Sequence, residues 1–222
     1  MSLEVIPDTI LARFQIAEHR HACTILAHDC PAEFNDVMTA LEDFDLLRSE
    51  IIAPGGAKTK IVERIERLFG KKGWKEEKSR IETIVNGVAR VGLTHSIDLC
   101  KGRVACELQW NSKDGVFSRD LATLRLLHEI DVISVGIIIT RCDELQALFK
   151  SLGYTRDNKP IAAKYGASTT HWSKLRERIG NSDAGMCPVL MIGIRKECYR
   201  DDIPGVPIIL PARSKSPRKP LP

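Results

Sequence analysis

The chain has 222 residues, 43% of them hydrophobic and 28% charged, which suits one globular domain and excludes a disordered chain. Its formal net charge of +4 permits a nucleic-acid partner without requiring one. No apolar run is long enough to span a bilayer and no secretion signal opens the sequence, so we expect a cytoplasmic protein with no membrane partner.

Helical patterns dominate the first ninety residues. Phe14–Ala27 has helical apolar spacing, and Pro31–Leu47 begins with a proline in the first turn, where a helix tolerates it. Lys60–Phe69 predicts an amphipathic helix that ends at Gly70–Gly73. The pattern of Ser79–Val91 fits either a further helix or a strand, and both interpretations stay open.

The seven cysteines are odd in number and contain no C-x-x-C pair, which argues against disulfides and for reduced thiols. One local group has the residue types of a zinc site. Its ligand types alternate without the glycine turn of a zinc knuckle, and the surrounding spacing is helical. We therefore favour isolated core thiols and surface histidines for this group, which is His19, His21, Cys23, His28 and Cys30.

A loop with the pattern Gly-Gly-x-Lys-x-Lys lies between two of these helices, at Ala53–Lys60. It looks like a phosphate-binding loop, but it lacks the G-x-x-x-x-G-K-[ST] spacing and no apolar strand leads into it. We therefore reject a nucleotide site. Lys58 and Lys60 could still contact a DNA phosphate.

A β-hairpin is predicted where the apolar runs Ser96–Leu99 and Val104–Trp110 flank Lys101-Gly102. A two-residue turn there would set Asp98 opposite Ala105. Side chains alternate between the two faces of a strand. One face then carries Asp98, Ala105, Glu107 and Gln109, while Val104, Cys106, Leu108 and Trp110 take the other and can enter the core.

The two carboxylates on the polar face suggest a metal site. In the expected register Asp98 and Glu107 are diagonal neighbours, which lie about 7–8 Å apart at the backbone and within reach of long side chains. With no Lys or Arg between them on that face, the two charges repel unless a cation joins them. Oxygen ligands favour a hard divalent ion such as Mg²⁺. The alternative is a hairpin whose polar face only meets water.

Helices and buried strands alternate after the hairpin, which indicates an α/β core with a mixed sheet and a helical N-terminal part. We assign residues 1–200 to this single domain. Residues 201–222 contain six prolines and a basic run, and we expect them to form a disordered tail. The predicted elements are a helix at Phe117–Ile130, a strand at Val132–Thr140, a helix at Asp143–Leu152 and a strand at Pro188–Arg195.

The connection Tyr154–Cys187 is longer than an ordinary loop and is rich in hydroxyl and basic side chains. Hydroxyl groups reach base edges or phosphates, and cations hold phosphates. Within it, Thr170–Ile179 predicts a helix capped by Thr169 or Thr170. An ordinary solvated basic helix is the alternative interpretation.

Three stretches of the chain carry a likeness to a known family, which extends from about Phe69 to Ile194. They are FGKKGWKEEKSR (Phe69–Arg80), CKGRVACELQWN through VFSRDL (Cys100–Leu121), and VISVGIIIT, KYGAS and PVLMIGI in that order. Together they resemble the restriction endonucleases of the BglII/BstYI type, a branch of the PD-(D/E)xK nuclease superfamily. The E-x-Q signature formed by Glu107 and Gln109 is the most specific part, because most nucleases of this superfamily carry E-x-K there.

The resemblance implies a restriction-endonuclease-like fold and a Mg²⁺-dependent type II restriction endonuclease. Such an enzyme hydrolyses phosphodiester bonds of double-stranded DNA at a short palindrome, here expected to be centred on GATC. It acts as a homodimer, with the helix Phe117–Ile130 or the N-terminal helices supplying the contact. A cognate DNA methyltransferase would be its genetic partner.

The resemblance also assigns roles to residues of this chain. Asp98, Glu107 and Gln109 would be catalytic, and Asp98, Glu107 and the backbone carbonyl of Leu108 would bind Mg²⁺. Gln109 would orient the attacking water, since an amide cannot act as a base. Glu82 or Asn86 would complete the site, and the sequence does not choose between them. DNA contacts would come from Asn111, Ser112, Lys113, Lys164, Ser168, Thr169 and Thr170.

The sequence also allows two other functions. A related nuclease acting in repair would depend on DNA structure rather than on sequence. A sequence-specific DNA-binding protein that has lost catalysis would act by occupancy alone, and the presence of both Asp98 and Glu107 counts against it.

Overall fold

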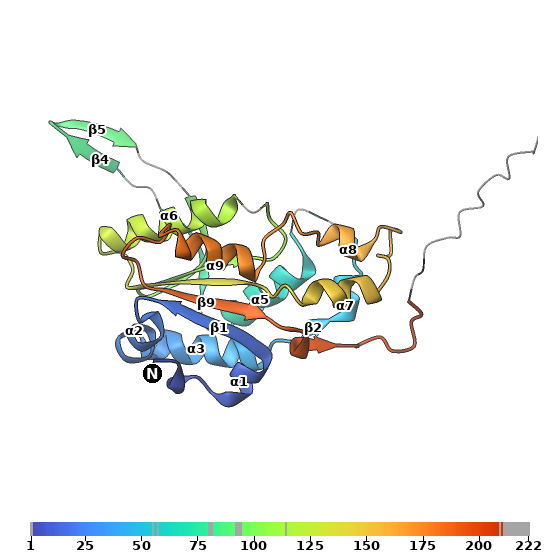
Figure 1. Ribbon diagram of the computed structural model, residues 1–222. Coiled ribbons are helices and arrows are strands. Elements are labelled where there is room, and N and C mark those ends of the chain that lie inside the picture. The colour runs from blue at the N-terminus through green and yellow to red at the C-terminus, as the bar shows by residue number, and fades with distance from the viewer. Residues whose placement is uncertain are drawn as a thin grey trace, which may run out of the picture.

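A mixed sheet of six strands forms the centre of the protein in the computed structural model (Figure 1). The structure describes residues 2–54, 56, 58–79, 82–91, 95–113, 115–208 and 210. The inner strands β7, β8 and β9 run parallel, and β1, β6 and β3 pair antiparallel with their neighbours. In spatial order the strands are β1 (Phe14–His19), β9 (Val189–Ile194), β8 (Val135–Arg141), β7 (Val104–Gln109), β6 (His95–Lys101) and β3 (Lys75–Ser79).

Helices cover both faces of this sheet, and each face has its own hydrophobic cluster (Figure 1). The predicted α/β class with a mixed sheet between helices is therefore confirmed. No helix of the described ranges is long and apolar enough to cross a membrane. One face carries α6 (Val116–Glu129) and α9 (Trp172–Gly180); the other carries α1 (Asp8–Arg13), α2 (Ala22–Asp29), α3 (Pro31–Glu42), α4 (Arg48–Ile51), α5 (Lys60–Gly70), α7 (Leu145–Ser151) and α8 (Ile161–Lys164).

The inner strands β8 and β9 are buried along their whole length, as their continuous apolar runs predict. Gly136 on β8 allows helix α6 to lie close to the sheet. A Cβ atom at this position would lie 2.8 Å from Cδ1 of Leu124, so any side chain here would force Leu124 of α6 to shift. This close approach brings α6 over the strand that carries Glu107 and Gln109.

The predicted helix at Phe14–Ala27 is wrong in its first half. Phe14–His19 forms the edge strand β1, and only Ala22–Asp29 is helical. The apolar spacing fits a helix locally, but all six residues of β1 pair with β9. Hydrogen bonding to a strand far along the chain overrides the local pattern.

Residues 82–91, which the sequence left open between helix and strand, form a β-hairpin. Strands β4 (Glu82–Val85) and β5 (Val88–Val91) pair around a turn at Asn86-Gly87. The hairpin projects away from the body formed by the central sheet and its helices (Figure 1). Its exposed hydrophobic residues include Ile84 and Val88.

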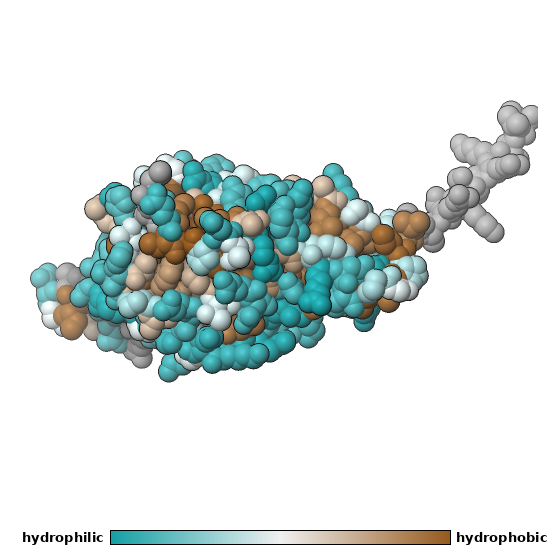
Figure 2. Space-filling model, turned by 90° about the horizontal axis from the view of Figure 1, so that it is seen from below, coloured by the Kyte–Doolittle hydropathy of each residue, from teal (hydrophilic) through white to brown (hydrophobic). Residues whose placement is uncertain are grey.

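The chain continues along the body beyond residue 200, where the sequence predicts the start of a tail. The guanidinium of Arg48, which is 4% exposed, donates to a carboxylate oxygen of Asp201 at 3.2 Å and to the carbonyls of Ile203 and Val206 at 3.2 and 2.7 Å. Strand β10 (Tyr199–Arg200) pairs with β2 (Leu46–Leu47) just before this contact. Val206, Ile208 and Leu210 of this segment are exposed hydrophobic residues. Figure 2 shows hydrophobic surface at the end of the described chain. Residues 211–222 lie outside the described part.

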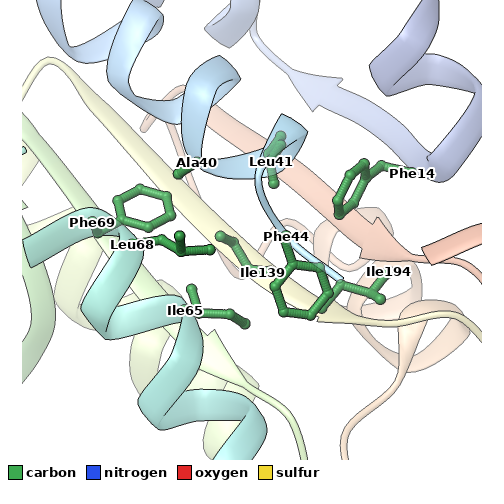
Figure 3. A pocket seen from close by; sticks show the side chains of 9 residues that line it. All are labelled: Phe14, Ala40, Leu41, Phe44, Ile65, Leu68, Phe69, Ile139 and Ile194. Carbon is green, nitrogen blue, oxygen red and sulfur yellow. The ribbon is translucent and has the colours of Figure 1, made fainter. Parts of the chain in front are cut away.

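A small cavity lies between α3, α5 and the sheet (Figure 3). Its volume of about 10 Å³ is close to the minimum that a single water molecule needs. All its side chains are apolar, so it offers no ligand for a metal ion and no donor for a phosphate. We regard it as a packing defect of the core, lined by Phe14, Ala40, Leu41, Phe44, Ile65, Leu68, Phe69, Ile139 and Ile194.

Candidate active site

The hairpin of β6 and β7 brings the two predicted metal ligands, Asp98 and Glu107, opposite each other on neighbouring strands. Its turn lies at Gly102–Arg103, one residue later than predicted. Ala105 pairs with Cys100, so the predicted pairing of Ala105 with Asp98 is wrong. Continuing this register sets Asp98 opposite Glu107. Direct partners share one face of a sheet, so the two carboxylates lie nearer than the diagonal neighbours expected.

A β-bulge in β6 sets the position of Asp98. The register between β3 and β6 shifts here, so that Asp98–Leu99 lies opposite the single residue Glu76. Such bulges redirect side chains and are common beside active sites. One carboxylate oxygen of Asp98 accepts a hydrogen bond from the backbone N–H of Leu108 at 2.9 Å, which ties the carboxylate to β7. Glu76 in turn accepts from the hydroxyl of Ser96.

Glu107 is 1% exposed and lies among other carboxylates. Burial raises the pKa of its carboxyl group to about 10, and the charges of Asp120 and Asp98 add to the increase. The protein alone thus disfavours a charged Glu107. A bound divalent cation would reverse this preference, since opposite charge stabilises the carboxylate. The donor set of two carboxylates and nearby backbone oxygens fits a hard cation such as Mg²⁺.

Gln109 contacts a residue that the sequence analysis missed. Its Nε2 donates to Oδ2 of Asp120 at 2.6 Å, and Asp120 on α6 is 0% exposed. Burial raises the pKa of Asp120 to about 6, while the Arg119 guanidinium opposes this shift. The signal was present, because Asp120 lies three residues after Phe117 on the apolar stripe of its helix. A charged residue on a core stripe requires a partner.

A cleft of about 270 Å³ opens beside these groups. Asp98 and Gln109 lie on one side, Arg119 comes from α6, and Lys58 and Thr59 come from the loop before α5. Lys58 ion-pairs with Glu66 across 2.5 Å, and this bond, with a smaller contribution from Asp98, raises the pKa of its ammonium group. Cations and carboxylates thus share one cleft, which suits a phosphodiester and a cation together. Its described lining is Gly56, Lys58, Thr59, Val62, Asp98, Leu108, Gln109, Trp110, Asn111, Ser112 and Arg119.

The two segments predicted to read bases lie side by side next to this cleft. The backbone N–H of Thr170 donates to the carbonyl of Ser112 at 2.8 Å, and Lys113 forms a β-bridge with Thr169. Asn111 and Ser112 also line the cleft. These contacts join a strand end and a loop that are almost sixty residues apart in the sequence.

The predicted DNA-contacting residues differ in their accessibility. Lys113 and Ser168 are exposed, whereas Thr170 is fully buried, with 0% exposure. Neither predicted threonine caps α9, whose N-cap is His171. Lys164 directs its ammonium group to the carbonyl of Ala53 at 2.7 Å, so it braces the loop before α5. Thr170 and Lys164 thus make contacts within the protein.

Both upstream candidates lie on the projecting hairpin, Glu82 in β4 and Asn86 in its turn. Neither is among the described residues that line the cleft. Glu76 on β3 is an upstream acidic residue that lies opposite Asp98–Leu99 in the sheet, but it too is not among the described residues that line the cleft. It lies six residues before Glu82 in the sequence.

The zinc-like residue types near the N-terminus do not assemble into a site within the described ranges. Cys23 and Cys30 are buried free thiols. Burial raises the pKa of Cys23 to about 11, which keeps it protonated. Across the residues that the structure describes, no group of three or more His, Cys, Asp or Glu side chains could hold a metal ion. A cation beside Asp98 and Glu107 would therefore need backbone, water or phosphate oxygens as further ligands.

Residues 14–194 match the sequence model of the family described as restriction endonuclease BglII/BglIII. The matched range runs from the first residue of β1 to the last residue of β9 and so contains the whole central sheet. It also contains the cleft and both segments beside it. A comparison with curated protein sequences returned no match.

Proposed function

Because the chain belongs to the BglII/BglIII restriction endonuclease family, we propose that Asp98, Glu107 and Gln109 form the catalytic centre of this enzyme. It is a type II restriction endonuclease, a hydrolase that cuts double-stranded DNA at specific sites. One observation carries the proposal. Strand β7, with the E-x-Q signature, and the bulged strand β6 bring two carboxylates together. They lie beside a cleft that is also lined by the cationic side chains of Lys58 and Arg119.

Asp98, Glu107 and the carbonyl oxygen of Leu108 would hold a divalent cation, which we propose to be Mg²⁺. Bound there, the cation would lower the pKa of a water molecule and neutralise charge that develops on the phosphate. The contribution of the chain is to keep a buried carboxylate, that of Glu107, close to the half-buried carboxylate of Asp98. The N–H of Leu108 donates to one oxygen of Asp98, and the side chains of Asp98 and Glu107 also hydrogen-bond to each other, so a cation would replace the proton between the two carboxyl groups.

Gln109 would orient the attacking water through a hydrogen bond. Its amide group cannot take the proton of that water, because it does not titrate near neutral pH. The proton therefore passes to solvent or to an oxygen of the substrate phosphate. Lys58 and Arg119 line the same cleft and would hold phosphate oxygens of the bound strand.

We propose that Asn111, Ser112, Lys113, Ser168 and Thr169 read the bases. The two segments are joined to each other and adjoin the cleft. The base contacts would therefore be held at a fixed position relative to the scissile phosphate. The site would be a short palindrome centred on GATC. Two-fold symmetry of such a site calls for a homodimer. A cognate methyltransferase would protect the host DNA.

The first experiment is a digest of unmethylated phage DNA with purified protein, with Mg²⁺ and with EDTA. We expect discrete Mg²⁺-dependent fragments whose sequenced ends share one palindrome. A smear would instead support a structure-directed nuclease. Intact DNA together with a sequence-specific gel shift would support a binding protein without catalysis.

Asp98→Ala is the matched variant for this digest. Because Asp98 holds the cation whereas base and phosphate contacts come mainly from other residues, we expect cleavage to be lost and specific binding to remain. Single-turnover cleavage and a gel shift on one cognate duplex measure the two properties. Cleavage by Asp98→Ala at the wild-type rate would refute the proposed catalytic centre.

A further inference from the structure

Both carboxylate oxygens of Asp120 accept hydrogen bonds in the interior. Oδ2 accepts from Nε2 of Gln109 at 2.6 Å, and Oδ1 accepts from two nitrogens of Arg119 at 3.2 and 3.1 Å. The Asp120 side chain is 0% exposed, whereas that of Arg119 is 53% exposed. A hydrogen-bonded chain thus leads from a half-exposed cation in the cleft, through a buried carboxylate, to the amide of Gln109.

These hydrogen bonds decide which end of the Gln109 amide can bind a water molecule. A carboxylate only accepts hydrogen bonds, so the NH₂ end of the amide must face Asp120. The carbonyl oxygen Oε1 is then the remaining end, and it is buried with no hydrogen bond from the described residues. Without a partner, the terminal torsion of glutamine is broad and nearly two-fold, so the amide would rotate between two orientations.

We propose that Asp120 is a positioning residue that holds the Gln109 amide with its carbonyl oxygen toward the attacking water. The water then donates one hydrogen bond to Oε1, which leaves an oxygen lone pair directed at the phosphorus. The inference rests on the proposed role of Gln109. Arg119 keeps the carboxylate in place from the cleft side, so Asp120 acts through Gln109 and need not touch DNA.

The direct test replaces Asp120 with asparagine, which has the same shape. The Arg119 nitrogens point donors at this side chain, so the new amide places its oxygen there and its NH₂ group toward Gln109. Gln109 must then turn its own oxygen inward. We expect the single-turnover cleavage rate of Asp120→Asn to fall about 100-fold, with the affinity for the cognate duplex unchanged.

A second substitution should reverse this loss. In the double variant Asp120→Asn with Gln109→Glu, residue 109 is a carboxylate that accepts from the new amide at position 120 through one oxygen and offers the other to water. We expect the double variant to cleave faster than either single variant. Rates that multiply, as they do for independent sites, would overturn the inference.

The control is Glu197→Gln, which lies outside the helix that carries Asp120. It removes a carboxylate that pairs with Arg195 at 3.4 Å, and neither of these two residues is among the described residues that line the cleft. Its cleavage rate should equal that of the wild type. Asp98→Ala distinguishes a failure of the inference about Asp120 from a failure of the proposed catalytic centre. If that variant is inactive while Asp120→Asn cleaves normally, only the inference about Asp120 fails; if it is active, the catalytic centre itself is wrong.

A measurement on the unchanged protein covers the case in which Asp120→Asn fails to fold. The side-chain NH₂ group of Gln109 donates to a buried carboxylate, so its hydrogens should exchange with solvent about tenfold or more slowly relative to those of exposed Gln15. Nitrogen-edited NMR of the wild-type protein resolves both groups. Equal exchange at Gln15 and Gln109 would show that the amide is not held.

Discussion

The carboxyl group of Glu107 lies where a negative charge is costly unless a cation accompanies it. It is buried, and it faces Asp98 if the pairing of β6 with β7 is continued by one residue. Asp120 is near enough to raise its pKa. The site therefore stores a destabilising interaction that ligand binding relieves. This is the common arrangement at functional sites, where local stability is given up for chemistry.

The stability of the metal-free protein should therefore depend on pH. The pKa of Glu107 is about 10 in the folded protein and 4.5 ordinarily, so the folded state keeps a proton that the unfolded state releases between these values. The free energy of unfolding thus falls as the pH rises through this window. Glu107→Gln should weaken the fall, and Ca²⁺ should raise the melting temperature of the wild type more at pH 9 than at pH 6. Thermal melts of both proteins provide the test, and equal pH slopes would contradict it.

At the scale of elements, α6 is the helix that connects packing to chemistry. It supplies Arg119 to the cleft and Asp120 to Gln109, and its Leu124 side chain packs closely against Gly136 of the sheet. Gly136→Ala should cost about 1–3 kcal/mol of folding free energy through overpacking and should slow cleavage by moving the helix. Gly115→Ala is the control, because a Cβ atom there meets nothing within 4 Å. Urea unfolding and cleavage rates measure both effects.

A second element-scale contact holds the loop beside the cleft. Arg141, which ends β8, is 2% exposed and donates to the carbonyls of Tyr165 and Gly166 at 3.1 Å and to the hydroxyl of Thr169 at 2.8 Å. Its guanidinium thus fixes a loop that we propose to read bases.

Arg141→Gln should loosen this loop, because glutamine cannot reach all three acceptors. We expect specific DNA binding to weaken by about 10- to 100-fold, in line with about 1–3 kcal/mol for buried acceptors left unsatisfied. Arg200→Gln is the control, because this exposed guanidinium pairs with Asp45 at 3.2 Å and is not among the described residues that line the cleft. Binding of cognate and unrelated duplexes should show that the loss concerns the cognate duplex. An equal loss on both would point to a general change in charge.

At the scale of the whole molecule, the contacts of the C-terminal segment define where the chain can be shortened without loss of stability. A chain that ends at Leu210 keeps the partners of Arg48, and we expect it to melt and cleave like the full chain. A chain that ends at Arg200 loses Asp201 and the carbonyls of Ile203 and Val206, leaving a buried guanidinium without these acceptors. It should be about 1–3 kcal/mol less stable. Equal unfolding curves for the two truncated chains would show that the segment contributes nothing.

The sequence by itself determined those features whose signal is local. Period-two alternation placed Glu107 and Gln109 on one face of a strand, continuous apolar runs marked β8 and β9, and helical periodicity marked α5 and α6. These patterns suffice because neighbouring residues of one element share faces at fixed intervals. The E-x-Q signature lies within such an element, so the class of enzyme was readable from the chain.

Only the tertiary structure decided the features that depend on pairing between distant residues. The edge strand β1 exists because β9 lies beside it, and the bulge at Asp98–Leu99 exists because β3 pairs there with one residue against two. The contacts of Asp120 with Gln109 and of Thr170 with Ser112 likewise require two elements to meet. Local periodicity carries no information about which partner an element meets, since that choice is made by burial and hydrogen bonding of the assembled chain.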